Sequence, residues 1–133
     1  MAHEVPKVRD YPINEIVPGQ LVHYPELAAV QQCHRGWVAG PYIKGLEGIP
    51  FEVKCEVQQK GDERAEWSEP APGETFVLVL SGATTICYLI DGEEKRVTVS
   101  AGQSIHQSNA IPHKWVVLED NTMVVTVRLY GST

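Results

Sequence analysis

Two histidines lie seven residues apart in the stretch AGQSIHQSNAIPHKW, residues 101–115, on either side of an Asn-Ala-Ile-Pro turn. Imidazole nitrogens bind transition metals, and near neutral pH they also act as general bases or hydrogen-bonding groups. His106 and His113 are therefore the first candidates for chemistry in this chain. A metal site needs three or four converging donors, so the two histidines would need a further ligand from elsewhere.

Trp115 follows two residues after His113 and is a candidate for lining a pocket. A tryptophan offers a large flat apolar surface and one N–H donor, so it is used at ligand pockets as well as in cores. Core packing is the commoner role, and pocket lining is the alternative for Trp115. Trp37 and Trp67 lie near other candidate positions.

The composition excludes several classes of partner. The chain has 133 residues, of which 43% are hydrophobic and 21% charged, as expected for one globular domain. The net charge is −6, and no cluster of lysine and arginine is longer than a pair, so we expect neither nucleic acid nor a membrane surface as partner. The N-terminal sequence lacks the apolar segment of a secretory signal. We expect a cytoplasmic protein, in which Cys33, Cys55 and Cys87 stay reduced.

Strand patterns dominate the chain from residue 36 onward. No segment has a sustained period of 3.6 residues, and short apolar segments alternate with turn residues, which favours an all-β barrel or sandwich. Residues 1–30 are rich in proline, and we interpret them as an arm attached to a domain of residues 31–133. The expected strand segments are 49–59, 74–82, 83–100 with a hairpin turn at Asp91-Gly92, and 113–131 with a turn at 119–121.

The segment IPFEVKCEVQQ, residues 49–59, alternates strictly between apolar and polar residues. Its apolar positions are Phe51, Val53, Cys55 and Val57, and its polar positions are Glu52, Lys54, Glu56 and Gln58. One face of a barrel strand points inward, so we expect the apolar set in the core and the charged set outside. The alternative is that the charged set lines an internal cavity, where Arg128 of the last strand could join it.

Residues 100–113 resemble the second motif of the cupin superfamily, which is roughly P-x-G-D, four residues, P-x-G-x-P-H. Gly102 stands at the glycine, Gln103 at the acidic residue, and Ile111-Pro112-His113 at the ending, while Ser100 replaces the first proline. The resemblance implies a cupin-like antiparallel jelly-roll β-barrel with His113 at the position of a metal-binding histidine. It also implies a homodimer, because small cupins pair through edge strands.

The first cupin motif is similar only in its glycine, Gly82. Counting back from Gly82, the glutamate position falls on Thr75, and the two histidine positions fall within residues 68–71, where Glu69 is the plausible donor. Most of the usual cupin ligands are therefore replaced. We expect no metal cofactor; the alternative is a divalent transition metal on a reduced set of His113, His106 and Glu69.

The sequence thus predicts a binding module that holds a small polar or aromatic-bearing molecule in the barrel, with His106, His113 and Trp115 at its mouth. Two enzymatic alternatives stay open. One is a metal-dependent cupin with the reduced ligand set. The other is a metal-free isomerase or epimerase in which His113 or His106 acts as the general base. A role in protein interaction alone would leave the barrel filled with side chains.

Overall fold

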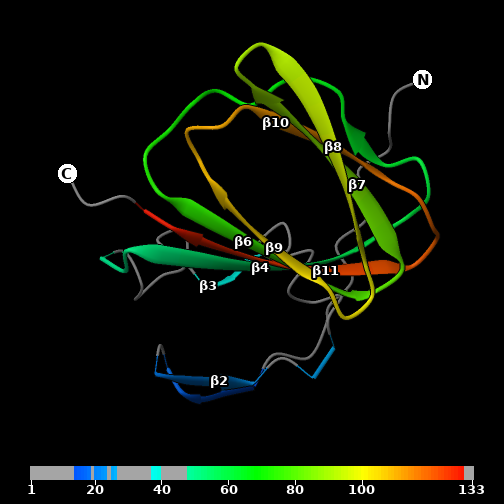
Figure 1. Cartoon of the computed structure of the whole chain (residues 1–133). Helices are drawn as coiled ribbons and strands as arrows, with labels where there is room; N and C mark the ends of the chain where they lie inside the picture. Colours follow the sequence, from blue (N-terminus) through cyan, green and yellow to red (C-terminus); the bar gives the residue numbers. More distant parts are fainter. Residues whose placement is uncertain (1–13, 19, 24, 27–36, 40–47, 131–133) are drawn as a thin grey trace, which may run out of the picture.

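The chain forms two antiparallel β-sheets that face each other, as seen in a computed structural model (Figure 1). The structure describes residues 14–18, 20–23, 25–26, 37–39 and 48–130. These residues contain strands β1 to β11 and no helix, so no helix among them could cross a membrane. The prediction of an all-β jelly roll is confirmed.

The larger sheet has five strands in the order β3-β4-β11-β6-β9, and the smaller has four in the order β5-β10-β7-β8. Apart from the consecutive pairs β3–β4 and β7–β8, neighbours within each sheet come from distant parts of the chain, as in a jelly roll. The five-stranded sheet contains β3 (Trp37–Ala39), β4 (Phe51–Gln58), β6 (Glu74–Ser81), β9 (Ser104–Ser108) and β11 (Thr122–Leu129). The four-stranded sheet contains β5 (Glu63–Arg64), β7 (Ala83–Ile90), β8 (Glu93–Ser100) and β10 (His113–Val117).

Two further strands lie in the segment predicted as an arm. Strands β1 (Asn14–Val17) and β2 (Leu21–His23) pair with each other in a separate small sheet, which is drawn below the five-stranded sheet in Figure 1. Ile16, Val17 and Leu21 are exposed on this ribbon. Cys33 and the boundary predicted near residue 30 lie outside the described residues.

Residues that tolerate a positive φ set the tight connections between strands. The β7–β8 hairpin turns at Asp91 and Gly92, whose φ angles are 52° and 80°, as the sequence predicts. Gly82 joins β6 to β7 with a φ of 80°, and an added Cβ would lie 2.2 Å from Oγ1 of Thr122. A side chain at position 82 would therefore collide with β11, so the glycine lets the β6–β7 connection pass close to the start of β11.

The apolar core fills one part of the space between the sheets. Val77, Val79 and Val124 of the larger sheet pack against residues of the smaller sheet, among them Ile86 and Val99. These side chains stand on alternate positions of their strands, which explains why one face of each strand is buried. The remaining interior space is lined largely by polar side chains.

The orientation of β4 corrects the prediction for its two faces. Glu52, with no exposed surface, pairs across the strands with Arg128, and the charged row that it begins faces the interior. The apolar row, which includes Phe51 and Cys55, faces outward and is half-buried. Charged groups can be buried when they are paired, and here the partners lie on β4 itself and on β11.

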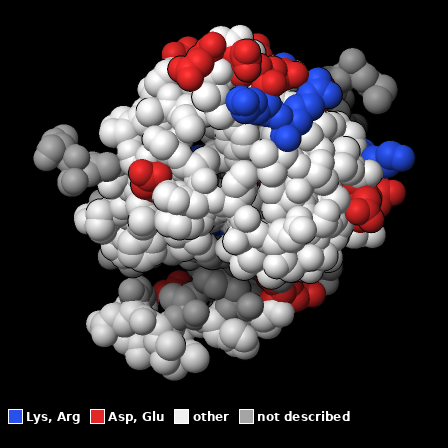
Figure 2. Space-filling model, viewed as in Figure 1, with Lys and Arg blue, Asp and Glu red and all other residues white. Residues whose placement is uncertain are grey.

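The outer face of the five-stranded sheet is apolar beyond β4 as well. Phe76, Leu78 and Leu80 of β6 alternate with its inward residues and are 40%, 39% and 49% exposed. Figure 2 shows that acidic and basic side chains instead gather at the β7–β8 hairpin, where residues 93–96 are exposed. We call the outward side of β4, β11 and β6 the outer apolar face.

Candidate functional site

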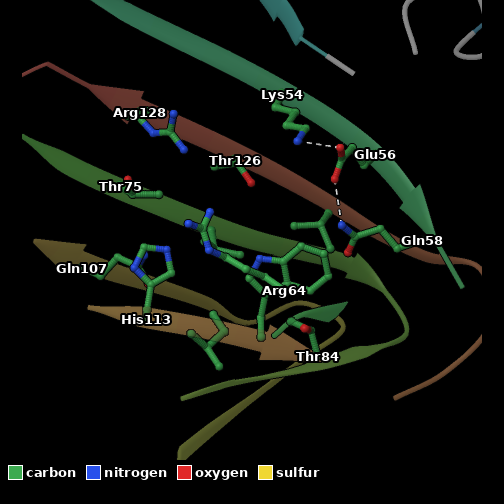
Figure 3. A pocket seen from close by; sticks show the side chains of 14 residues that line it. Lys54, Glu56, Gln58, Arg64, Thr75, Thr84, Gln107, His113, Thr126 and Arg128 are labelled. Carbon is green, nitrogen blue, oxygen red and sulfur yellow. Dashed lines mark hydrogen bonds and ion pairs between the residues drawn. The ribbon is translucent and has the colours of Figure 1, made fainter. Parts of the chain in front are cut away.

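A cavity of about 220 Å³ lies between the two sheets, on the side where β4 faces β5 and β10 (Figure 3). Its volume is below the range of roughly 300–1,000 Å³ for pockets that hold drug-sized ligands, so only a small molecule would fit inside it. The walls combine a charged row, a guanidinium that enters from the edge, an imidazole and an apolar floor. The interior is therefore not filled with side chains.

Strand β4 supplies the charged wall. Lys54, Glu56 and Gln58 stand on alternate positions of the strand, and all three point into the cavity in Figure 3. Lys54 Nζ lies 2.6 Å from Glu56 Oε1, and Gln58 donates a hydrogen bond of 2.7 Å to Glu56 Oε2. This chain of contacts holds the three side chains in fixed positions along the wall.

Arg128 continues this wall from the adjacent strand β11. Its Nη1 donates to Glu52 Oε1 at 2.6 Å, and the hydroxyl of Tyr130 donates to Glu52 Oε2 at 2.8 Å. Glu52 therefore has a donor on each carboxylate oxygen, which offsets part of the cost of burying its charge. The contacts also fix the guanidinium of Arg128 at the cavity wall.

Arg64 reaches the cavity from β5, the short edge strand of the smaller sheet. Its Nε donates to the carbonyl of Glu66 at 3.1 Å, and Figure 3 shows its guanidinium near the middle of the cavity, on the side of His113. Arg64 pairs across the strands with Trp115 of β10. A short strand of two residues thus places a cation over the apolar floor.

His113 is held at the start of β10 by contacts to its Nδ1 atom. Ser68 Oγ lies 2.9 Å and the Ile111 carbonyl 3.3 Å from Nδ1, and the His113 backbone N–H donates to Ser68 Oγ at 3.0 Å. The Ile111 carbonyl can only accept, so this contact favours the tautomer with its proton on Nδ1, in which Nε2 is the basic nitrogen. Burial lowers the pKa of His113, and the charges of Arg64 and Arg128 lower it further.

The floor of the cavity is apolar, and Gln107, which is hydrogen-bonded to Tyr88, forms part of the cavity wall. Trp115 and Ile86 form part of this floor. Burial raises the pKa of Tyr88 to about 12, so the phenol stays protonated and donates to Oε1 of Gln107. Because its oxygen accepts from Tyr88, Gln107 presents its amide N–H donors on the cavity wall.

Solved structures share this arrangement of strands. The conserved protein SPY1581 of unknown function from Streptococcus pyogenes matches with a TM-score of 0.51 at 26% identity, over 63% of this chain and 68% of that chain. An oxalate decarboxylase with Mn(II) centres from Bacillus subtilis matches with a TM-score of 0.58 at 16% identity, over 73% of this chain and 25% of that chain. These neighbours are cupin-fold proteins. The chain has the cupin fold.

A further cupin neighbour is Streptomyces albus HEPD with 2-hydroxyethylphosphonate and Fe(II) bound, which matches with a TM-score of 0.53 at 14% identity, over 62% of this chain and 19% of that chain. This chain therefore spans about a quarter or less of the length of these two enzymes, and it matches SPY1581 over most of that chain. No protein-family model matches the sequence, and neither does any curated protein.

The cupin motif placed His113 correctly beside the cavity but could not place His106. The structure puts His106 on the outward face of β9, where its side chain is 56% exposed, contacts Glu74 at 2.8 Å and stacks on Phe76 with ring centroids 4.6 Å apart. Its neighbour Gln107 takes the inward position. The prediction that His106 lies at the barrel mouth is corrected, because side chains alternate along a strand and His106 stands one position out of register.

The residues present do not fit a cupin metal centre. Glu69 is exposed, and Thr75, which occupies the position of the cupin glutamate, is buried at the cavity with a hydroxyl that donates to Asn109. Within the described residues, no group of three histidine, cysteine or acidic side chains could hold a metal ion. The positive charges of Arg64 and Arg128 act on His113, and they would repel a metal cation bound there.

Proposed function

We propose that this protein binds a small organic molecule inside its barrel without a metal ion. The observation that supports this function most is a small cavity in which fixed polar groups converge over an apolar floor. Binding sites for small molecules combine these two features, because apolar surface supplies affinity and a few polar groups fix orientation. His113 and Trp115 would contact the ligand, whereas His106 lies on the opposite side of its sheet.

A screen of small molecules by thermal shift tests this function. The screen is run on protein treated with a chelator, and it includes anionic, neutral and cationic compounds. Compounds that raise the melting temperature are tested again on Trp115→Ala, with Trp67→Ala as the control, because Trp67 is not part of the cavity wall. Binding that requires added metal, or binding that persists unchanged in Trp115→Ala, would contradict the proposal.

The geometry of His113 favours a second candidate, a metal-free isomerase or epimerase. Nε2 is the basic nitrogen of an imidazole whose Nδ1 is fixed by Ser68 and Ile111, as a general base requires. Its lowered pKa keeps it unprotonated near neutral pH. Exchange of ligand C–H protons with deuterated water, abolished in His113→Gln and retained in His106→Gln, would support this candidate.

We further propose that the protein is a homodimer that pairs through its outer apolar face. Exposed apolar patches of this kind are uncommon on monomers, and Glu74 beside the patch has His106 Nε2 2.8 Å from its carboxylate. A mainly apolar surface can contact its own copy across a two-fold axis. Sedimentation velocity of the wild type and of Leu78→Lys distinguishes a dimer from a monomer. A wild-type monomer at tens of micromolar would overturn the proposal.

We also infer that the protein works in a reducing compartment such as the cytoplasm. The thiols of Cys55 and Cys87 are both free. Burial and the nearby Glu56 raise the pKa of Cys55, which keeps this thiol protonated and unreactive.

A further inference from the structure

The described residues that line the cavity carry more positive than negative charge. Among them, Lys54, Arg64 and Arg128 contribute to the wall, and Glu56 is the acid. Glu56 is 2.6 Å from Lys54, and Arg128 is 2.6 Å from the buried Glu52. Within residues 48–130, Arg64 forms no ion pair with a carboxylate, and its described hydrogen bond goes to a neutral carbonyl. One positive charge therefore remains without a counterion in the described part of the cavity.

The neutral groups around this charge do not compensate it. His113 is uncharged at neutral pH, since burial and the two arginines oppose its protonation. Gln107 presents its amide donors to the same space, because its oxygen is engaged by Tyr88. Two guanidinium groups and an amide are hydrogen-bond donors, and a planar anion satisfies such donors with two oxygens at once.

We infer that the ligand is a small organic carboxylate, held by Arg64 and Arg128, with its apolar part against Trp115 and Ile86. The inference rests on the proposed binding function and specifies the class of ligand. The apolar floor favours an organic carboxylate over an inorganic anion, which would leave Trp115 and Ile86 without a partner. The volume of about 220 Å³ limits the ligand to a molecule of the size of a simple aromatic or short aliphatic acid.

Matched probes test the charge without any substitution in the protein. Titration calorimetry compares acetate and benzoate with acetamide and benzamide, which have the same shapes without the charge, and with benzamidinium, which has the opposite charge. Inorganic phosphate tests the anion without an apolar part. We expect benzoate to bind about tenfold or more tightly than benzamide, and more tightly than acetate or phosphate, with no binding of benzamidinium.

The substitution Arg64→Gln tests the residue. It should weaken benzoate about tenfold or more and leave benzamide within about twofold, whereas Arg96→Gln, on the exposed side of β8, should change neither. Circular dichroism checks that both variants are folded. If Arg64→Gln does not fold, the comparison of benzoate with benzamide on the wild type still decides whether the ligand is a carboxylate.

Benzoate binding should also take up a proton below about pH 7, because an anion beside His113 raises its pKa.

The outcomes separate this inference from the proposed function. Each of three results would overturn the inference that Arg64 holds an organic carboxylate. Binding of benzamide as tight as benzoate would leave a neutral ligand for the same cavity, and equal binding of phosphate would leave an inorganic anion. An Arg64→Gln variant that binds benzoate like the wild type would show that Arg64 does not hold the ligand. If no probe of any charge binds and the thermal-shift screen also fails, the proposed function is wrong as well.

Discussion

Arg128 is predicted to stabilise the fold chiefly by neutralising the buried carboxylate of Glu52. Glu52 has no exposed surface, and its two oxygens accept from Arg128 at 2.6 Å and from Tyr130 at 2.8 Å. The substitution Arg128→Met keeps most of the apolar stem and removes the charge. Breaking a buried ion pair costs about 3–5 kcal/mol, because the remaining charge has no counterion. The Arg128 side chain is 40% exposed, so water can reach the site and we expect the lower end, about 3 kcal/mol.

A double-mutant cycle distinguishes loss of charge pairing from loss of packing. Glu52→Gln keeps an acceptor for Tyr130 and removes the negative charge, so adding it to Arg128→Met should recover about 1 kcal/mol or more. The control is Arg96→Met, which breaks a surface pair with Glu94 and should cost about 1 kcal/mol or less.

The free energy of unfolding is measured for each variant by urea denaturation, followed by tryptophan fluorescence. Two results would refute the reasoning. One is a cost for Arg128→Met no larger than that for Arg96→Met. The other is a double variant no more stable than Arg128→Met alone, since this would mean that Glu52 carries no unpaired charge when Arg128 is absent.

Three further predictions concern other parts of the structure. Gly82→Ala should destabilise the protein by about 2 kcal/mol or more in urea denaturation, because its Cβ would collide with Thr122 and its φ is positive. The control is Gly92→Ala, where the added Cβ meets nothing. A loss of stability no larger than that of the control would show that the collision relaxes. The pKa of His113 is lowered in the folded protein, so the unfolded chain binds a proton more readily than the folded one. Neutral His113 therefore contributes to the free energy of unfolding above about pH 6.5, and this contribution is lost as the pH falls toward the folded pKa. Urea midpoints between about pH 7.5 and pH 5.5 should therefore fall less steeply for His113→Gln than for the wild type or His106→Gln, and parallel curves would contradict this assignment. Protein purified without added metal should contain well under one equivalent of transition metal by elemental analysis, and near-stoichiometric metal that is lost in His113→Ala would reverse this conclusion.

Local sequence pattern was enough for six of the strands, β4, β6, β7, β8, β10 and β11, and for one of the two histidines. The dipeptide Asp91-Gly92 defines a tight hairpin by its backbone preferences alone, and the structure has this turn. The interval from Gly102 to His113 spans one strand and one turn, so it fixes where His113 enters the next strand. Neither feature requires knowledge of distant contacts.

The facing of β4 could not be read from β4 itself. Alternation shows that one face is apolar and the other charged, but which of them is buried depends on partners far along the chain. Glu52 is paired with Arg128, 76 residues away. The prediction for His106 was wrong for a related reason, because a shift of one position exchanges it with Gln107. No sequence pattern indicated that Arg64 lies on a strand, since two residues are too few to show a strand period.

Several of the groups that would choose the ligand, although not Arg128 and Trp115, are encoded close together. Lys54, Glu56 and Gln58 on β4 and Arg64 on β5 belong to one continuous stretch that is folded back by the turn between the two strands. The positions that correspond to cupin metal ligands, Thr75 and His113 among them, lie elsewhere in the chain. Ligand preference and metal chemistry can therefore diverge independently in such a barrel. Transplanting residues 52–64 into a metal-binding cupin should carry over the charged row and Arg64 while leaving its metal in place, and the full choice of ligand would also require Arg128 and Trp115.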